Sequence, residues 1–87
     1  MAVVWIPSLM RDLTAGQAQV IVEGQTLGAV IDALERTYPG VKGRLLKHGK
    51  LVPTVHALID GRVSLLGLGE SVAEHAEIQF VPAIAGG

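Results

Sequence analysis

The printed sequence ends in two glycines, Gly86 and Gly87, and these are the residues of the chain best suited to chemistry. Glycine has no Cβ, so residues of this type are free to lie extended in a narrow channel of another protein. The carboxylate of Gly87 would then reach an active site that belongs to that protein. The alternative interpretation is a frayed tail or a cloning remnant without a function.

The other residue types that carry chemistry give weaker signals. The chain has no cysteine, which excludes disulfides and thiolate metal sites. His48, His56 and His75 lack the spacing of metal ligands, so we expect no metal site and interpret them as surface or structural residues. The serines lie in no motif of a nucleophilic triad. We expect a solvated acidic rim, and not catalytic acids, at Glu70, Glu74 and Glu77.

Length and composition limit the class of protein. The chain has 87 residues, of which 49% are hydrophobic and 17% are charged, and this predicts one domain with one core. A net charge of −1 argues against a nucleic-acid-binding protein, which needs clustered Lys and Arg. The start of the sequence lacks a basic leader and no apolar run is as long as a membrane span, so we expect a cytoplasmic protein.

The hydrophobic pattern predicts one long helix among several strands. Thr26 stands before apolar residues spaced as on one face of a helix, and Pro39-Gly40 ends this pattern. A short helical turn is expected over 41–46. Strands are predicted over 2–6, 18–22, 54–59, 62–66 and 77–81. This order is typical of an α+β domain with one main helix on one face of a mixed, four- to five-stranded sheet.

A sheet that is covered on one face shows alternation along its strands. The inward set is predicted to comprise Val4, Ile6, Val20, Val22, Val55, Ala57, Ile59, Ile78 and Phe80. The outward set includes four apolar residues on four different strands: Trp5, Ile21, Leu58 and Val81. We predict that the domain covers residues 1–81 and that residues 82–87 form a flexible tail, whose six residues reach at most about 20 Å when extended.

The chain resembles the MoaD/ThiS family of ubiquitin-like sulfur carrier proteins. The resemblance is carried by Ile6-Pro7 with Leu9–Arg11, Thr14–Gln17, Thr26–Ile31, Leu34-Glu35, Tyr38–Gly40 and Val81–Gly87. Many family members have a glycine-containing turn before the last strand. This chain has Ala73–Ala76 there, so a left-handed residue either falls on His75 or is absent.

The resemblance implies a β-grasp fold and a role for the tail. A carboxylate is a poor electrophile and must be activated before it accepts sulfur. In the family, a ubiquitin-activating-type adenylyltransferase and sulfurtransferase adenylates the terminal glycine with ATP and magnesium, and sulfide equivalents then give a thiocarboxylate. By resemblance, Gly87 carries the sulfur, while Gly86 and Ala85 thread the channel. The chain itself would bind no cofactor and would act as a carrier rather than an enzyme.

Several functions share this tail. The opening segment and Thr14–Gln17 look most like carriers that supply sulfur to a cysteine-synthase-type enzyme. The first alternative is the small subunit of molybdopterin synthase, which would make the chain a synthase subunit and its partner the large subunit. The second is a ubiquitin-like modifier that is joined to lysines. The third is a β-grasp interaction domain with an incidental diglycine.

The outward apolar residues suggest where such partners dock. In the strand order of the β-grasp fold, Trp5, Ile21, Leu58 and Val81 would lie side by side next to the root of the tail. An apolar patch of this kind on a small domain indicates a partner-binding surface.

Overall fold

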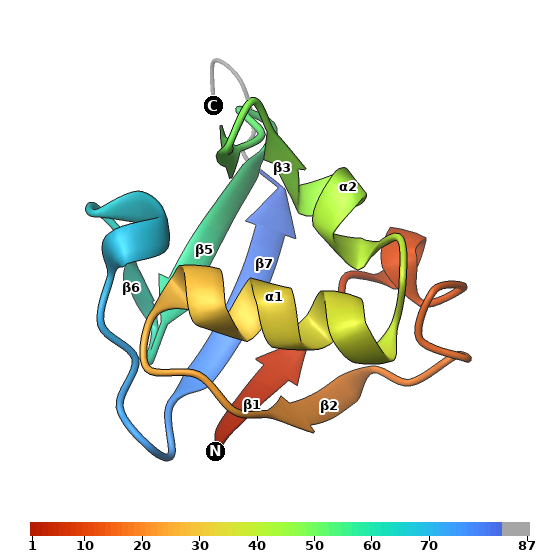
Figure 1. Cartoon of the computed structure of the whole chain (residues 1–87), viewed down its shortest axis with the longest axis horizontal. Helices are drawn as coiled ribbons and strands as arrows, with labels where there is room; N and C mark the ends of the chain where they lie inside the picture. Colours follow the sequence, from red (N-terminus) through yellow and green to blue (C-terminus); the bar gives the residue numbers. More distant parts are fainter. Residues whose placement is uncertain (83–87) are drawn as a thin grey trace.

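The computed structural model describes residues 1–82 and contains a five-stranded mixed sheet (Figure 1). Its strands are β1 (Ala2–Trp5), β2 (Gln19–Val22), β5 (Val55–Ile59), β6 (Arg62–Val63) and β7 (Glu77–Pro82). They lie in the order β2-β1-β7-β5-β6. The β1–β7 pair is parallel and the other pairs are antiparallel. The predicted α+β class and the β-grasp order, with the first strand between the second and the last, are confirmed.

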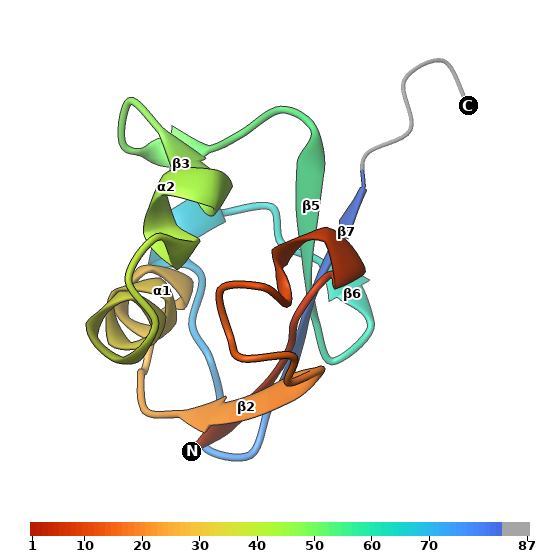
Figure 2. The same ribbon diagram turned by 90° about the vertical axis from the view of Figure 1, so that its right-hand side faces the viewer.

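Helix α1 (Leu27–Thr37) crosses one face of this sheet, as Figures 1 and 2 show. The Thr26 hydroxyl accepts a hydrogen bond from the Ala29 N–H at 3.1 Å, so the predicted N-cap is confirmed. The buried face of the helix comprises Leu27, Val30, Ile31, Ala33 and Leu34. These positions follow the helical period, which explains why the helix packs along one stripe.

A second helix, α2 (Val41–Leu45), follows a sharp turn at Gly40, whose φ is 106°. The Glu35 carboxylate accepts hydrogen bonds from the backbone N–H groups of Gly40 and Lys42, at 3.1 and 2.8 Å. These bonds satisfy N–H groups that the start of a helix leaves unpaired. Val41 and Leu45 are both fully buried, as the sequence predicts.

The core lies between α1, α2 and the inner face of the sheet. In β1, β2 and β7 the inward residues are buried and alternate with more exposed ones. The predicted inward set is confirmed at Val4, Ile6, Val20, Val22, Ala57, Ile59, Ile78 and Phe80, whereas Val55 is only half-buried. The alternation of the sequence therefore assigns the residues of every long strand to the correct face of the sheet.

The structure differs from several of the predicted elements and bounds. A small hairpin of β3 (Leu46–Lys47) and β4 (Lys50–Leu51) stands where only a turn is expected. The strand predicted over 62–66 ends at Val63, and Pro82 belongs to β7 rather than to the tail. Short 3₁₀ helices occupy Ser8–Met10 and Gly67–Gly69. His75 is not left-handed, so the family's left-handed position before the last strand is absent.

Candidate functional site

Strand β7 is the last element that the structure describes, and it ends at Pro82. It lies in the middle of the sheet and pairs with β5 from Ile78, opposite Ile59, to Pro82, opposite Val55. The root of the predicted tail is therefore anchored on a central strand. The residues predicted to carry the chemistry, Ala85, Gly86 and Gly87, lie outside the described part of the chain.

The outer face of the sheet carries the four residues predicted to bind a partner. No described helix covers this face, since α1 and α2 both lie on the opposite side (Figure 2). Ile21 is 65% exposed, and Trp5, Leu58 and Val81 are half-buried. The indole N–H of Trp5 donates a hydrogen bond to the Glu77 carboxylate at 3.3 Å. The assignment of Trp5 to the outer face is thus consistent with its exposure and its polar partner.

The strand register corrects how these four residues lie relative to one another. Gln79 is the partner of both Trp5 and Leu58, so it separates them. Ile21 lies opposite Val3, not opposite Trp5.

Val81 in turn lies opposite His56. The prediction that the four are direct neighbours is therefore wrong. On this face Trp5 and Leu58 flank Gln79, Val81 follows Gln79 two residues later on β7, and Ile21 lies diagonal to Trp5 on β2. Only long or aromatic side chains reach one another at diagonal positions.

A hollow of about 340 Å³ lies at the root of the tail, between the end of β7 and the loop after β1. Its walls are mostly apolar, with Pro7, Leu9 and Phe80 among the lining residues. Leu9 is 86% exposed, and Arg44 of α2 reaches across to donate to the Leu9 carbonyl oxygen at 3.2 Å. Sequence reasoning missed this hollow, because its residues come from segments far apart in the chain. The only signal was that Leu9 lies in a segment that carries the family resemblance.

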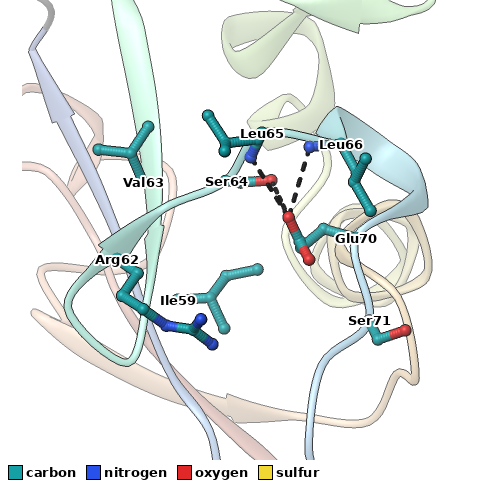
Figure 3. Close-up of a pocket in the computed structure, with 8 residues that line it drawn as sticks. All are labelled: Ile59, Arg62, Val63, Ser64, Leu65, Leu66, Glu70 and Ser71. Atoms are coloured by element: carbon teal, nitrogen blue, oxygen red, sulfur yellow. Dashed lines mark hydrogen bonds between the residues drawn. The ribbon is translucent and has the colours of Figure 1, made fainter.

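A second hollow, of about 290 Å³, lies beside β6 and is lined by Arg62, Ser64 and Glu70 among others (Figure 3). Figure 3 shows the Glu70 carboxylate turned toward the loop after β6. It accepts hydrogen bonds from the Ser64 hydroxyl at 3.2 Å and from the N–H groups of Leu65 and Leu66 at 3.3 and 3.4 Å. Glu70 therefore shapes a loop and is not part of a solvated rim, which corrects the sequence interpretation.

Within residues 1–82 no cluster of three or more His, Asp or Glu side chains could hold a metal ion. His48 and His56 are exposed, on the β3–β4 turn and on β5 respectively. In the same range, no helix has the length and apolar character needed to cross a membrane. The described geometry thus concentrates the candidate site at the outer face and the tail root.

Known proteins show the same fold and the same sequence pattern. The sulfur carrier protein CysO of Mycobacterium tuberculosis is 40% identical over 88 residues, which cover 94% of both chains. A chain in the crystal structure of the Amycolatopsis orientalis BexX/CysO complex superposes with a TM-score of 0.93 at 30% identity, with full coverage of both chains. Small archaeal modifier protein 3 of Haloferax volcanii is 36% identical over 64 residues, 71% of this chain and 70% of its own. Residues 4–87 match the ThiS family, and the chain therefore belongs to that family.

Proposed function

We propose that this chain is a sulfur carrier protein that supplies sulfur for cysteine biosynthesis as a thiocarboxylate on Gly87. The observation that carries the proposal is the match to sulfur carrier protein CysO over 94% of the chain. The fold supports it, because β7 anchors Pro82 in the centre of the sheet and five residues follow to Gly87. Five extended residues span at most about 17 Å, enough to enter a channel while the domain stays outside.

The reaction takes place in two steps on the terminal carboxylate. The Gly87 carboxylate attacks the α-phosphate of ATP, which gives an acyl-adenylate and releases pyrophosphate. Hydrosulfide then attacks the acyl carbon; the bond to the AMP oxygen breaks, AMP leaves, and a thiocarboxylate and a proton remain. ATP, magnesium and the catalytic groups belong to an adenylyltransferase of the ubiquitin-activating type. This chain supplies the acyl group and, in Gly86 and Ala85, residues with no side chain beyond a hydrogen or a methyl group, which fit a narrow channel.

The outer face of the sheet is the proposed docking surface for these enzymes. Trp5, Ile21, Leu58 and Val81 expose apolar area on this face, with the polar Gln79 between Trp5 and Leu58. A large aromatic residue surrounded by polar groups is typical of an interface centre, since tryptophan is enriched among residues that dominate binding energy. Val81 also lines the hollow at the tail root, so the docking face continues to the point from which the tail leaves.

Mass spectrometry of the intact chain tests the proposal. After co-expression with the adenylyltransferase and sulfur source of its own genome, we expect a mass gain equal to the exchange of one oxygen for one sulfur. Deletion of Gly87 should abolish this gain, because the carboxylate would stop about 3.5 Å short of the active site. Misplacements of about 1 Å already reduce rates by about 100-fold. Ala83→Ser, which alters the tail without shortening it, serves as the matched control.

One further function has a specific observation in its favour. Small archaeal modifier protein 3 is 36% identical to this chain over 64 residues, which supports a ubiquitin-like modifier joined to lysine side chains. The same experiment separates the two functions. Conjugates of high mass that disappear on deletion of Gly87 would identify a modifier, and an unchanged mass for the wild-type chain would contradict both functions.

A further inference from the structure

The hairpin of β3 and β4 places two like charges directly opposite each other. Lys47 of β3 pairs in register with Lys50 of β4, and both side chains are exposed. Like charges at directly opposite positions destabilise an antiparallel pair. Among residues 1–82 the recorded ion pairs are Lys42–Asp32 and Arg44–Asp12, so neither Lys47 nor Lys50 has a described carboxylate as its partner. The hairpin thus carries an unfavourable pairing that the domain itself does not relieve.

The turn of this hairpin uses left-handed backbone at two residues. His48 has φ of 55° and Gly49 has φ of 77°, the left-handed pair that a tight two-residue hairpin requires. Histidine is among the non-glycine residue types enriched at positive φ, so the turn is compatible with its sequence. The unfavourable feature of the hairpin is therefore the pairing of Lys47 with Lys50. Local choices that oppose the fold occur mainly where a protein has a function to perform.

The segment that covers α2 and the hairpin is the most basic part of the sequence. Four of the seven Lys and Arg residues lie within residues 42–50, and no Asp or Glu occurs between Glu35 and Asp60. The chain as a whole has a net charge of −1. Lys42 and Arg44 lie on α2 and pair with Asp32 and Asp12, so the positive charge of this segment that lacks a described carboxylate partner falls on Lys47 and Lys50 of the hairpin.

The basic hairpin stands at the end of the molecule from which the tail leaves. Figures 1 and 2 both show β3 at the same end as the C-terminal end of β7. Arg44, three residues before Lys47, lines the hollow at the tail root together with Pro82. An enzyme that takes up the residues after Pro82 must approach this end, so its surface around the channel faces the hairpin.

We infer that Lys47 and Lys50 form a cationic docking element that binds carboxylate side chains beside the tail channel of the adenylyltransferase. The inference rests on the proposed function, because it places the tail in that enzyme. Acidic groups of the partner supply the counter-charges that the domain lacks, and they relieve the Lys47–Lys50 repulsion on binding. Complementary charges of this kind mainly raise the association rate and make it depend on salt. A protein partner fits better than a nucleic acid, because the basic element is small and the adjoining hollow is apolar.

Stopped-flow association with the purified adenylyltransferase, at low and at physiological salt, tests this inference. The variant Lys47→Gln/Lys50→Gln should associate about tenfold more slowly at low salt, and its rate should depend less on salt. Arg36→Gln/Arg62→Gln removes the same charge from exposed positions on α1 and β6 and should stay within about twofold of the wild type. Lys50→Glu should slow association further while its Tm is equal to or above that of the wild type, since opposite charges then face each other.

Equal association rates for the wild type and Lys47→Gln/Lys50→Gln at low salt would overturn the inference. The inference would also be overturned if the variant Lys47→Gln/Lys50→Gln associated with the enzyme at the wild-type rate but lost binding to single-stranded oligouridine. That result would identify a nucleic-acid site. The mass gain of the wild-type chain is measured in parallel. If that gain is absent, the proposed function fails; if it is present while the lysine variant associates normally, only the inference about the hairpin fails.

Discussion

The two faces of the sheet are built from the same strands but are organised by different rules. On the inner face, consecutive inward positions of β1, β2 and β7 are apolar and buried. On the outer face, apolar side chains such as Trp5 and Leu58 are separated by polar residues such as Gln79. The inner face stabilises the fold through many contiguous apolar contacts. The outer face depends on a few dispersed side chains, and single substitutions there should alter binding with little effect on folding.

The comparison is tested most severely by two adjacent residues of β7. Ile78 is fully buried and Gln79 is exposed. Ile78→Ala should reduce the free energy of unfolding by about 2–5 kcal/mol, because it leaves a cavity in the core. Gln79→Ala should change it by less than about 0.5 kcal/mol. In a domain of this size the first change corresponds to a decrease in Tm of at least about 10 °C, measured by circular dichroism. Similar decreases for both variants would contradict the division into two faces.

Trp5→Ala should have the next largest effect, and on binding rather than on stability. An aromatic residue at an interface centre commonly accounts for about 2 kcal/mol, so the Kd for the adenylyltransferase should rise roughly 30-fold. Stability should fall by less than about 1 kcal/mol, the range of strand propensities. Titration calorimetry measures the affinity, and Trp5→Phe provides the control that keeps an aromatic ring. A large loss of stability with unchanged affinity would place Trp5 with the core residues.

The smallest expected effect concerns the hydrogen bond between Trp5 and Glu77. Glu77→Gln keeps an acceptor for the indole N–H but removes the charge, and the contact is exposed. The free energy of unfolding should therefore change by less than about 0.5 kcal/mol. Trp5 is the single tryptophan of the chain, so its fluorescence reports directly on this contact. Glu77→Leu, which removes the acceptor, should shift the emission maximum, whereas Glu77→Gln should not.

The sequence predicts the inner face well and the outer face only in part, for a physical reason. Alternation along a strand determines which side of the sheet each residue faces. It does not determine the stagger between neighbouring strands, because a shift by two residues leaves every face unchanged. Alternation thus places Ile21 and Trp5 on the correct face but does not identify their neighbours. The strand order, by contrast, followed from the family resemblance.

The short elements could not be predicted because they lack a period. The β3–β4 hairpin has two residues in each strand, too few for alternation to be seen. The strand after Gly61 was predicted too long, since Leu65 and Leu66 look like strand residues. Their N–H groups bind the Glu70 carboxylate instead of a neighbouring strand, so the ladder ends at Val63. These hydrogen bonds to a side chain four or five residues later thus override the preference of Leu65 and Leu66 for a strand.

The last strand of the described chain is also the middle strand of its sheet, with β1 on one side and β5 on the other. A force applied at Pro82 along the strand axis loads both ladders in shear, so their backbone hydrogen bonds share the load. An edge strand pulled sideways would instead lose its bonds one at a time. We therefore expect the described domain to resist unfolding under such a force, so that a partner holding the residues after Pro82 would release them before the domain opened.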